Sequence, residues 1–242
     1  MLIHAAVCPH PPLLVPELAG AAAPELDGLR AACGRAVRGA LAAVQAGRNG
    51  IVIVVGGGPD TRAHGPEAAG TLRPYGLDRT FGTGDPEGPD ALPLSLTIGR
   101  WLLEEAAAPG AAARFQSVGE DAAPAECLRL GRELAGSAER VAFLVMGDGS
   151  ACLSEKAPGY LDPRAEPYDE AVARALGDAD TAALAGLDPG VSRELLAAGR
   201  PAWQVLAGAA GEAGAAPFDA ELLDHRAPYG VGYFVATWTR RA

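Results

Sequence analysis

Two continuous apolar runs constrain most strongly what this chain can fold into. Residues 51–55 (IVIVV) and 141–146 (VAFLVM) are typical of strands that are buried on both faces of a parallel sheet. A third apolar run, residues 2–7, opens the chain and predicts another strand. Because Ala- and Leu-rich helical stretches separate these runs, the sequence predicts an α/β fold with a central, mainly parallel β-sheet flanked by helices on both faces.

A polar loop follows each of the three predicted strands. His10 lies in the first loop (CPHPPLL), where prolines fix φ on both sides and hold the histidine in one place. The second loop is residues 56–64 (GGGPDTRAH), and the third begins at residues 147–156 (GDGSACLSEK). Since ligands bind outside the carboxyl ends of parallel strands, His10, Asp60 and Asp148 are expected to line one cavity.

These loops supply the candidate ligand-binding residues, which are His10, Asp60, Thr61, Arg62, Asp148, Ser150 and Lys156, the only lysine. The three glycines of the second loop allow close backbone approach to a ligand. They form neither a P-loop, since no Gly-Lys-Ser/Thr follows, nor a dinucleotide-binding G-x-G-x-x-G. Simpler alternatives stay open: a rigid turn around His10, a flexible glycine turn, and an Asp148 that binds the amides of its own turn.

The other segments predict helices and minor strands. Residues 65–91 read as an irregular surface excursion with a short strand near 80–81, and residues 229–238 as a last strand, at an edge or antiparallel. His4 is expected to pack within the first strand, and His225 to lie in a polar turn before the last one. Helices are expected at 16–46 (one or two), 92–108, 124–135, 170–176, 181–187, 192–198 and 202–211, and a strand at 114–118.

Composition limits the partners and the cellular setting. The 242 residues are expected to form a single domain, 1–242, and the formal net charge of −10 argues against nucleic acid as a partner. The four cysteines are scattered without a C-x-x-C pair, which favours reduced thiols and a cytoplasmic location. No apolar run is long enough to predict a membrane span.

The motifs together resemble those of a known family. A short strand leading into residues 9–14 (PHPPLL), a buried strand into 58–60 (GPD), and a strand into 147–150 (GDGS) are similar to class III extradiol ring-cleavage dioxygenases. With the closing residues 229–233 (YGVGY), the chain resembles the LigB-type proteins of actinobacteria. The resemblance spans nearly the whole chain and implies a LigB-like three-layer fold and an oxidoreductase that opens aromatic diols.

The resemblance also implies a ferrous ion held by two histidines and one carboxylate, with open positions for catechol and dioxygen. His10 matches the first histidine ligand, but Thr61 stands where the family has its second, so that His64 is the remaining candidate metal ligand. The loop after residues 147–150 lacks the family's acid/base histidine. For the third ligand the sequence offers only weak matches, at Glu212, Glu221 or near Trp203.

Three functions therefore remain open. The first is an extradiol ring-opening dioxygenase that contains Fe(II), if His64 and a late carboxylate complete the family site. The second is a metal-free protein that uses the same pocket to bind an aromatic or anionic small molecule, or an enzyme other than a dioxygenase. The third is a partner chain without catalytic activity, in analogy with the two-chain members of the family, and a homo-oligomer is a related expectation.

Overall fold

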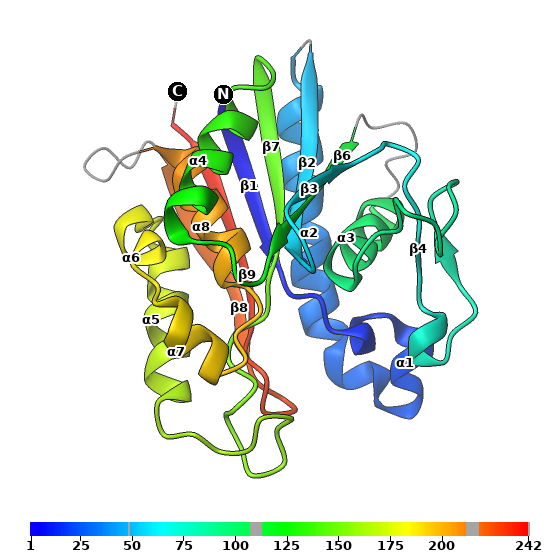
Figure 1. Ribbon diagram of the computed structural model, residues 1–242, viewed down its shortest axis with the longest axis vertical. Coiled ribbons are helices and arrows are strands. Elements are labelled where there is room, and N and C mark those ends of the chain that lie inside the picture. The colour runs from blue at the N-terminus through cyan, green and yellow to red at the C-terminus, as the bar shows by residue number, and fades with distance from the viewer. Residues whose placement is uncertain (48, 107–112, 212–217, 242) are drawn as a thin grey trace.

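The computed structural model describes residues 1–47, 49–106, 113–211 and 218–241. Within them, seven strands form one mixed sheet in the order β3-β6-β2-β7-β1-β9-β8 (Figure 1). Strands β6, β2, β7 and β1 run parallel to one another, and β3, β9 and β8 each lie antiparallel to their inner neighbour. The bounds are β1 Leu2–Cys8, β2 Gly50–Gly58, β3 Arg62–His64, β6 Ala113–Gly119, β7 Arg140–Met146, β8 Phe218–Arg226 and β9 Tyr233–Arg240.

Helices cover both faces of this sheet, which confirms the predicted α/β class (Figure 1). The helices α2 (Asp27–Gln45) and α3 (Leu94–Glu105) pack on one face. On the other face pack α4 (Pro124–Ala135), α5 (Ala165–Gly177), α6 (Thr181–Ala185) and α8 (Arg200–Ala210). The smaller elements are α1 Pro16–Ala19, α7 Pro189–Glu194, the 3₁₀ turns Pro12–Leu14, Gly20–Leu26 and Arg73–Tyr75, and the two-stranded ribbon of β4 Gly70–Thr71 and β5 Thr80–Phe81.

The strand sequences explain why the sheet needs helices on both sides. Successive side chains of a strand point to opposite faces. In β7, Leu144 packs under α2 and α3, whereas Phe143 and Val145 belong to the core on the side of α5 and α8. All three side chains are fully buried, so an uncovered face would expose a continuous apolar surface. The unbroken apolar runs therefore require a three-layer arrangement.

The carboxyl-terminal strands differ from the sequence prediction. The last strand, β9, is antiparallel as predicted, but it lies inside the sheet because β8 covers its outer side. The sequence did not predict β8, whose residues are mostly polar or half-exposed, as is common in an edge strand. His225, expected in a turn, belongs to β8. His4 is buried as expected, and its Nδ1 lies 3.1 Å from Thr239 Oγ1.

Two helix boundaries also differ. The predicted helix at 192–198 is α7, which begins earlier because the Asp188 side chain accepts a hydrogen bond from Val191 N–H and Pro189 occupies the first turn. The helix predicted at 170–176 also begins earlier, because α5 starts at Ala165. Asp169 therefore lies on a helix rather than in a loop.

Candidate functional site

His10 and Asp148 meet just beyond the carboxyl ends of β1 and β7. These strands are parallel neighbours with Cys8 opposite Met146, and Gly147 N–H donates to Cys8 O at 3.0 Å. The chains leave the sheet together, so the His10 backbone N–H donates to Asp148 Oδ1 at 2.8 Å. The same oxygen lies 3.7 Å from His10 Nδ1. The predicted convergence of these two loops is therefore visible for His10 and Asp148.

The His10–Asp148 pair is largely shielded from solvent. The side chains of His10 and Asp148 are only 10% and 13% exposed. Burial raises the pKa of Asp148, and the neighbouring His10 opposes this rise. Burial, followed by the nearby Asp148 carboxylate, raises the pKa of Tyr233. His10 Nδ1 is buried and has no hydrogen-bond partner among the described residues, so the ring retains unused bonding capacity.

Asp60, Thr61 and Arg62 make local contacts around the β6 end of the sheet. The Asp60 carbonyl accepts a hydrogen bond from Ser117 Oγ at 2.8 Å, and its carboxylate lies 3.3 Å from Arg62 Nε. Thr61 Oγ1 accepts from Gly119 N–H at 2.9 Å. Arg62 also donates to Pro89 O at 2.6 Å. These contacts bind the second loop to β6 and to residues 85–91 rather than to His10.

His64 lies on β3, at the opposite side of the parallel strands from His10. Strands β6, β2 and β7 separate β3 from β1 in the sheet. The Nε2 atom of His64 lies 3.1 Å from Ser117 Oγ, and the Nδ1 atom of His64 lies 3.3 Å from Asp90 Oδ1. The His64 side chain is 1% exposed, so both nitrogens serve the packing of this edge strand.

The donor set does not fit the iron site that the family resemblance implies. A facial triad needs two imidazoles and a carboxylate on one ion. Here His10 lies beside Asp148, and His64 is held three strands away by Ser117 and Asp90. Among the described residues, no three His, Cys, Asp or Glu side chains are grouped so as to hold a metal ion. Glu221 lies exposed on β8, and Glu212 lies outside the described residues.

Ser150 and Lys156 have different environments. Ser150 is fully buried: its N–H donates to Asp169 Oδ1 at 2.8 Å, and its hydroxyl donates to Leu195 O at 3.0 Å. Lys156 is exposed in the loop that follows. Ser150 thus fixes the backbone of the third loop.

Sequence reasoning missed Asp169, a buried ionisable side chain on α5. It is 2% exposed, and burial raises its pKa to about 7. The sequence signal was only a polar stretch between two apolar segments. A buried carboxyl with a raised pKa is typical of functional sites.

The fold and this edge define an α/β protein of three layers whose candidate site lies outside the carboxyl ends of β1 and β7. The structure of the chain as a whole is similar to the crystal structure of an uncharacterized protein, JW3007, from Escherichia coli K12. The TM-score is 0.61 with 14% sequence identity, and the match covers 98% of this chain and 99% of that chain. At this identity the similarity establishes the fold alone. No family model matches the chain, and no curated protein is significantly similar to it in sequence.

Membrane insertion through a helix finds no support in the part of the chain that the structure describes. None of its helices combines the length and apolar character that a bilayer crossing requires.

Proposed function

We propose that the chain is a LigB-type protein, similar in fold to class III extradiol dioxygenases, that binds a small aromatic or anionic molecule without ferrous ion. The observation that carries this proposal is the contact between His10 and Asp148, at the sheet edge where such folds bind ligands, with His64 held elsewhere. The ligand belongs beside His10, at the carboxyl ends of β1 and β7.

The chemistry of the pair suits a hydroxylated aromatic acid. An imidazole can donate to or accept from a phenol or carboxylate, and its charge state changes in the physiological pH range. The Asp148 carboxylate lies 3.7 Å from His10 Nδ1. The backbone hydrogen bond from His10 N–H holds the carboxylate in place. The pair therefore provides a binding group and a proton donor.

The alternative whose expected results differ most from those of this proposal is aromatic ring opening at an iron site that forms around His10 and His64. It requires His64 and a late carboxylate to reach His10, although Ser117 and Asp90 now occupy both His64 nitrogens. A partner chain without catalytic activity is the other alternative, and native mass spectrometry of the purified protein distinguishes it through a stable hetero-complex.

We expect protein purified without a polyhistidine tag to contain far less than one iron per chain and to open protocatechuate very slowly, even after anaerobic loading with Fe(II). Each missing ligand lowers the affinity of the site for Fe(II). A missing acid/base group typically lowers the reaction rate by about 10²–10⁴-fold. Elemental analysis and an absorbance assay of ring cleavage measure both quantities. Near-stoichiometric iron, lost together with ring cleavage in a His64→Ala variant, would contradict the proposal.

Binding of the aromatic acid is expected to involve one histidine. The chain has four histidines, so their ring protons can be assigned in proton NMR spectra by four single His→Gln variants. Protocatechuate should shift the His10 resonance and leave that of His225 unchanged. Binding should weaken by about tenfold in His10→Gln, since one charge-assisted hydrogen bond is lost. Shifts confined to other histidines would overturn the proposal.

A further inference from the structure

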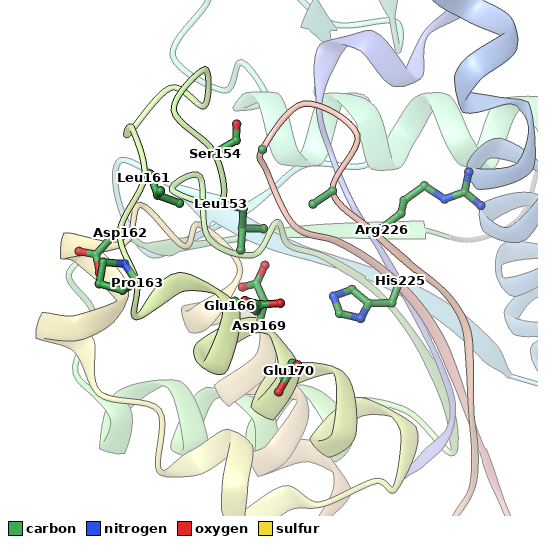
Figure 2. Close-up of a pocket in the computed structure, with 12 residues that line it drawn as sticks. Leu153, Ser154, Leu161, Asp162, Pro163, Glu166, Asp169, Glu170, His225 and Arg226 are labelled. Atoms are coloured by element: carbon green, nitrogen blue, oxygen red, sulfur yellow. The ribbon is translucent and has the colours of Figure 1, made fainter.

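A concave site lies on the α5 side of the molecule (Figure 2). It is a cavity of about 430 Å³, within the range of small-molecule sites. Its walls come from the loop after β7, the first turns of α5 and the β8–β9 hairpin. Its lining includes Leu153, Leu161, Asp162, Glu166, Asp169 and His225.

Asp169 is a buried carboxylate in the wall of this cavity with one oxygen unused. Its Oδ1 accepts a hydrogen bond from Ser150 N–H at 2.8 Å. Its Oδ2 is buried and has no hydrogen-bond partner within the described residues. A buried polar atom without a partner is rare and costly. The Asp169 Oδ2 atom therefore has an unfilled hydrogen-bonding position, and a donor group on a ligand can fill it.

Two glycines from distant segments make room for this carboxylate. A Cβ at Gly149 would lie 2.7 Å from both Asp169 oxygens, and a Cβ at Gly232 would lie 1.8 Å from Oδ2. Any other residue at either position would collide with the carboxylate. The loop after β7 and the segment before β9 are thus shaped around Asp169.

The charges that remain free in the cavity are negative. Asp162 is bound by Arg164, and Arg226 is bound by Asp224, so these two lining charges are compensated. Glu170 lies 3.8 Å from Arg174, a long and exposed pair. Burial lowers the pKa of His225, although Asp224 and Glu170 oppose this, so the imidazole is neutral at pH 7.

Glu166 is the exposed acidic neighbour of Asp169. It lies one helical turn before Asp169 on α5, and none of the ion pairs among the described residues involves it. Figure 2 shows Glu166 and Asp169 next to each other, with Leu153 and His225 among the neighbouring side chains that line the cavity. Glu166 and His225 are exposed, and both line the cavity together with the buried Asp169.

We propose that this cavity binds a primary amine with an apolar body, whose ammonium group pairs with Asp169 and Glu166. Leu153, Leu161 and the ring of His225, which is stacked on Phe234 at 4.7 Å, face the apolar part. A bare metal ion fits less well, because no three ligating side chains are grouped here in the described chain. The site is separate from His10 and does not depend on the function proposed above.

The test uses 2-phenylethylamine as the probe and 2-phenylethanol as its neutral analogue, each titrated into the full chain near pH 8 by calorimetry and NMR. The amine should bind at least about tenfold more tightly than the alcohol, because only the amine makes a charge-assisted pair. It should shift the His225 resonance and leave that of His10 unchanged. Equal affinity for the two probes would overturn the proposal, as would an amine displaced by equimolar Mn²⁺.

Variants separate this site from general surface attraction. Glu166→Gln and Asp169→Asn should each weaken amine binding by about tenfold, and the exposed Glu155→Gln should leave it unchanged. Glu166→Gln alters an exposed side chain, so it tests the site independently of any change in stability caused by Asp169→Asn. His10→Gln should bind the amine like the unmodified chain. Unchanged affinity in both acidic variants, or equal loss in Glu155→Gln, would show that Asp169 and Glu166 do not form the site.

Discussion

Replacing Asp169 with Asn should raise the free energy of unfolding at pH 8 by about 1–3 kcal/mol. The buried carboxyl has a pKa raised from 3.8 to about 7, so above pH 7 the folded protein carries a buried charge whose Oδ2 has no partner among the described residues. Asn keeps an oxygen that can accept the Ser150 N–H bond. Its buried amide group also lacks a partner, but an uncharged group costs less than an ion.

The sign of the pH dependence follows from proton binding. Between about pH 4 and pH 7 the folded state holds a proton on Asp169 that the unfolded chain has released, so the stability contribution falls as pH rises. One pKa unit corresponds to about 1.4 kcal/mol, which sets an upper figure of roughly 4 kcal/mol for the whole change. The advantage of Asn should therefore be absent near pH 4 and largest above pH 7.

Urea denaturation of both proteins at a series of pH values measures this difference directly. Other groups also titrate in this range, since the pKa of Asp148 is raised and that of His4 is lowered to about 4. Their effects cancel in the difference between the two proteins. The matched control is Asp178→Asn, which alters an exposed side chain. The free energy of unfolding of this variant should stay within about 0.5 kcal/mol of that of the unmodified protein at every pH. A difference curve that is flat from pH 4 to pH 8 would contradict the prediction.

Replacing Gly131 with Ala should destabilise the protein by about 3 kcal/mol or more and lower its melting temperature by about 6–12 °C. A Cβ at Gly131, on α4, would lie 2.0 Å from Val205 O and 2.7 Å from Ala209 N, both backbone atoms of α8. Gly208 on α8 faces Leu128 O in the same way, at 2.1 Å. The helices therefore meet backbone to backbone and must separate to accept a methyl group.

Gly34→Ala in α2 is the matched control for this substitution. The nearest atom to its added Cβ would be the flexible Arg38 guanidinium at 3.0 Å, which can move away. Alanine has a higher helix propensity than glycine by about 1 kcal/mol, so this variant should be slightly stabilised. Thermal denaturation followed by circular dichroism compares the two variants. Equal melting temperatures would show that the α4–α8 contact adapts to a larger residue.

Individual strands show why some of the sheet was predictable. The β2 and β7 sequences are apolar on both faces because each strand lies between two others and under helices on both sides. The β8 strand lies at the edge, and its many polar residues, which end in the consecutive run 224–226 (DHR), resemble a loop when read without a partner. Its pairing with β9, His225 opposite Phe234 among others, decides that it is a strand.

The sequence by itself determined the α/β class and the loop that brings His10 to the carboxyl edge of the sheet, since local apolar runs and prolines encode both. Only the tertiary structure decided which polar residues meet. It brought Asp148 to His10, held His64 on a distant edge strand, and seated Asp169 between Gly149 and Gly232. The physical reason is that burial, loss of hydration and missing partners depend on contacts between segments far apart in the chain.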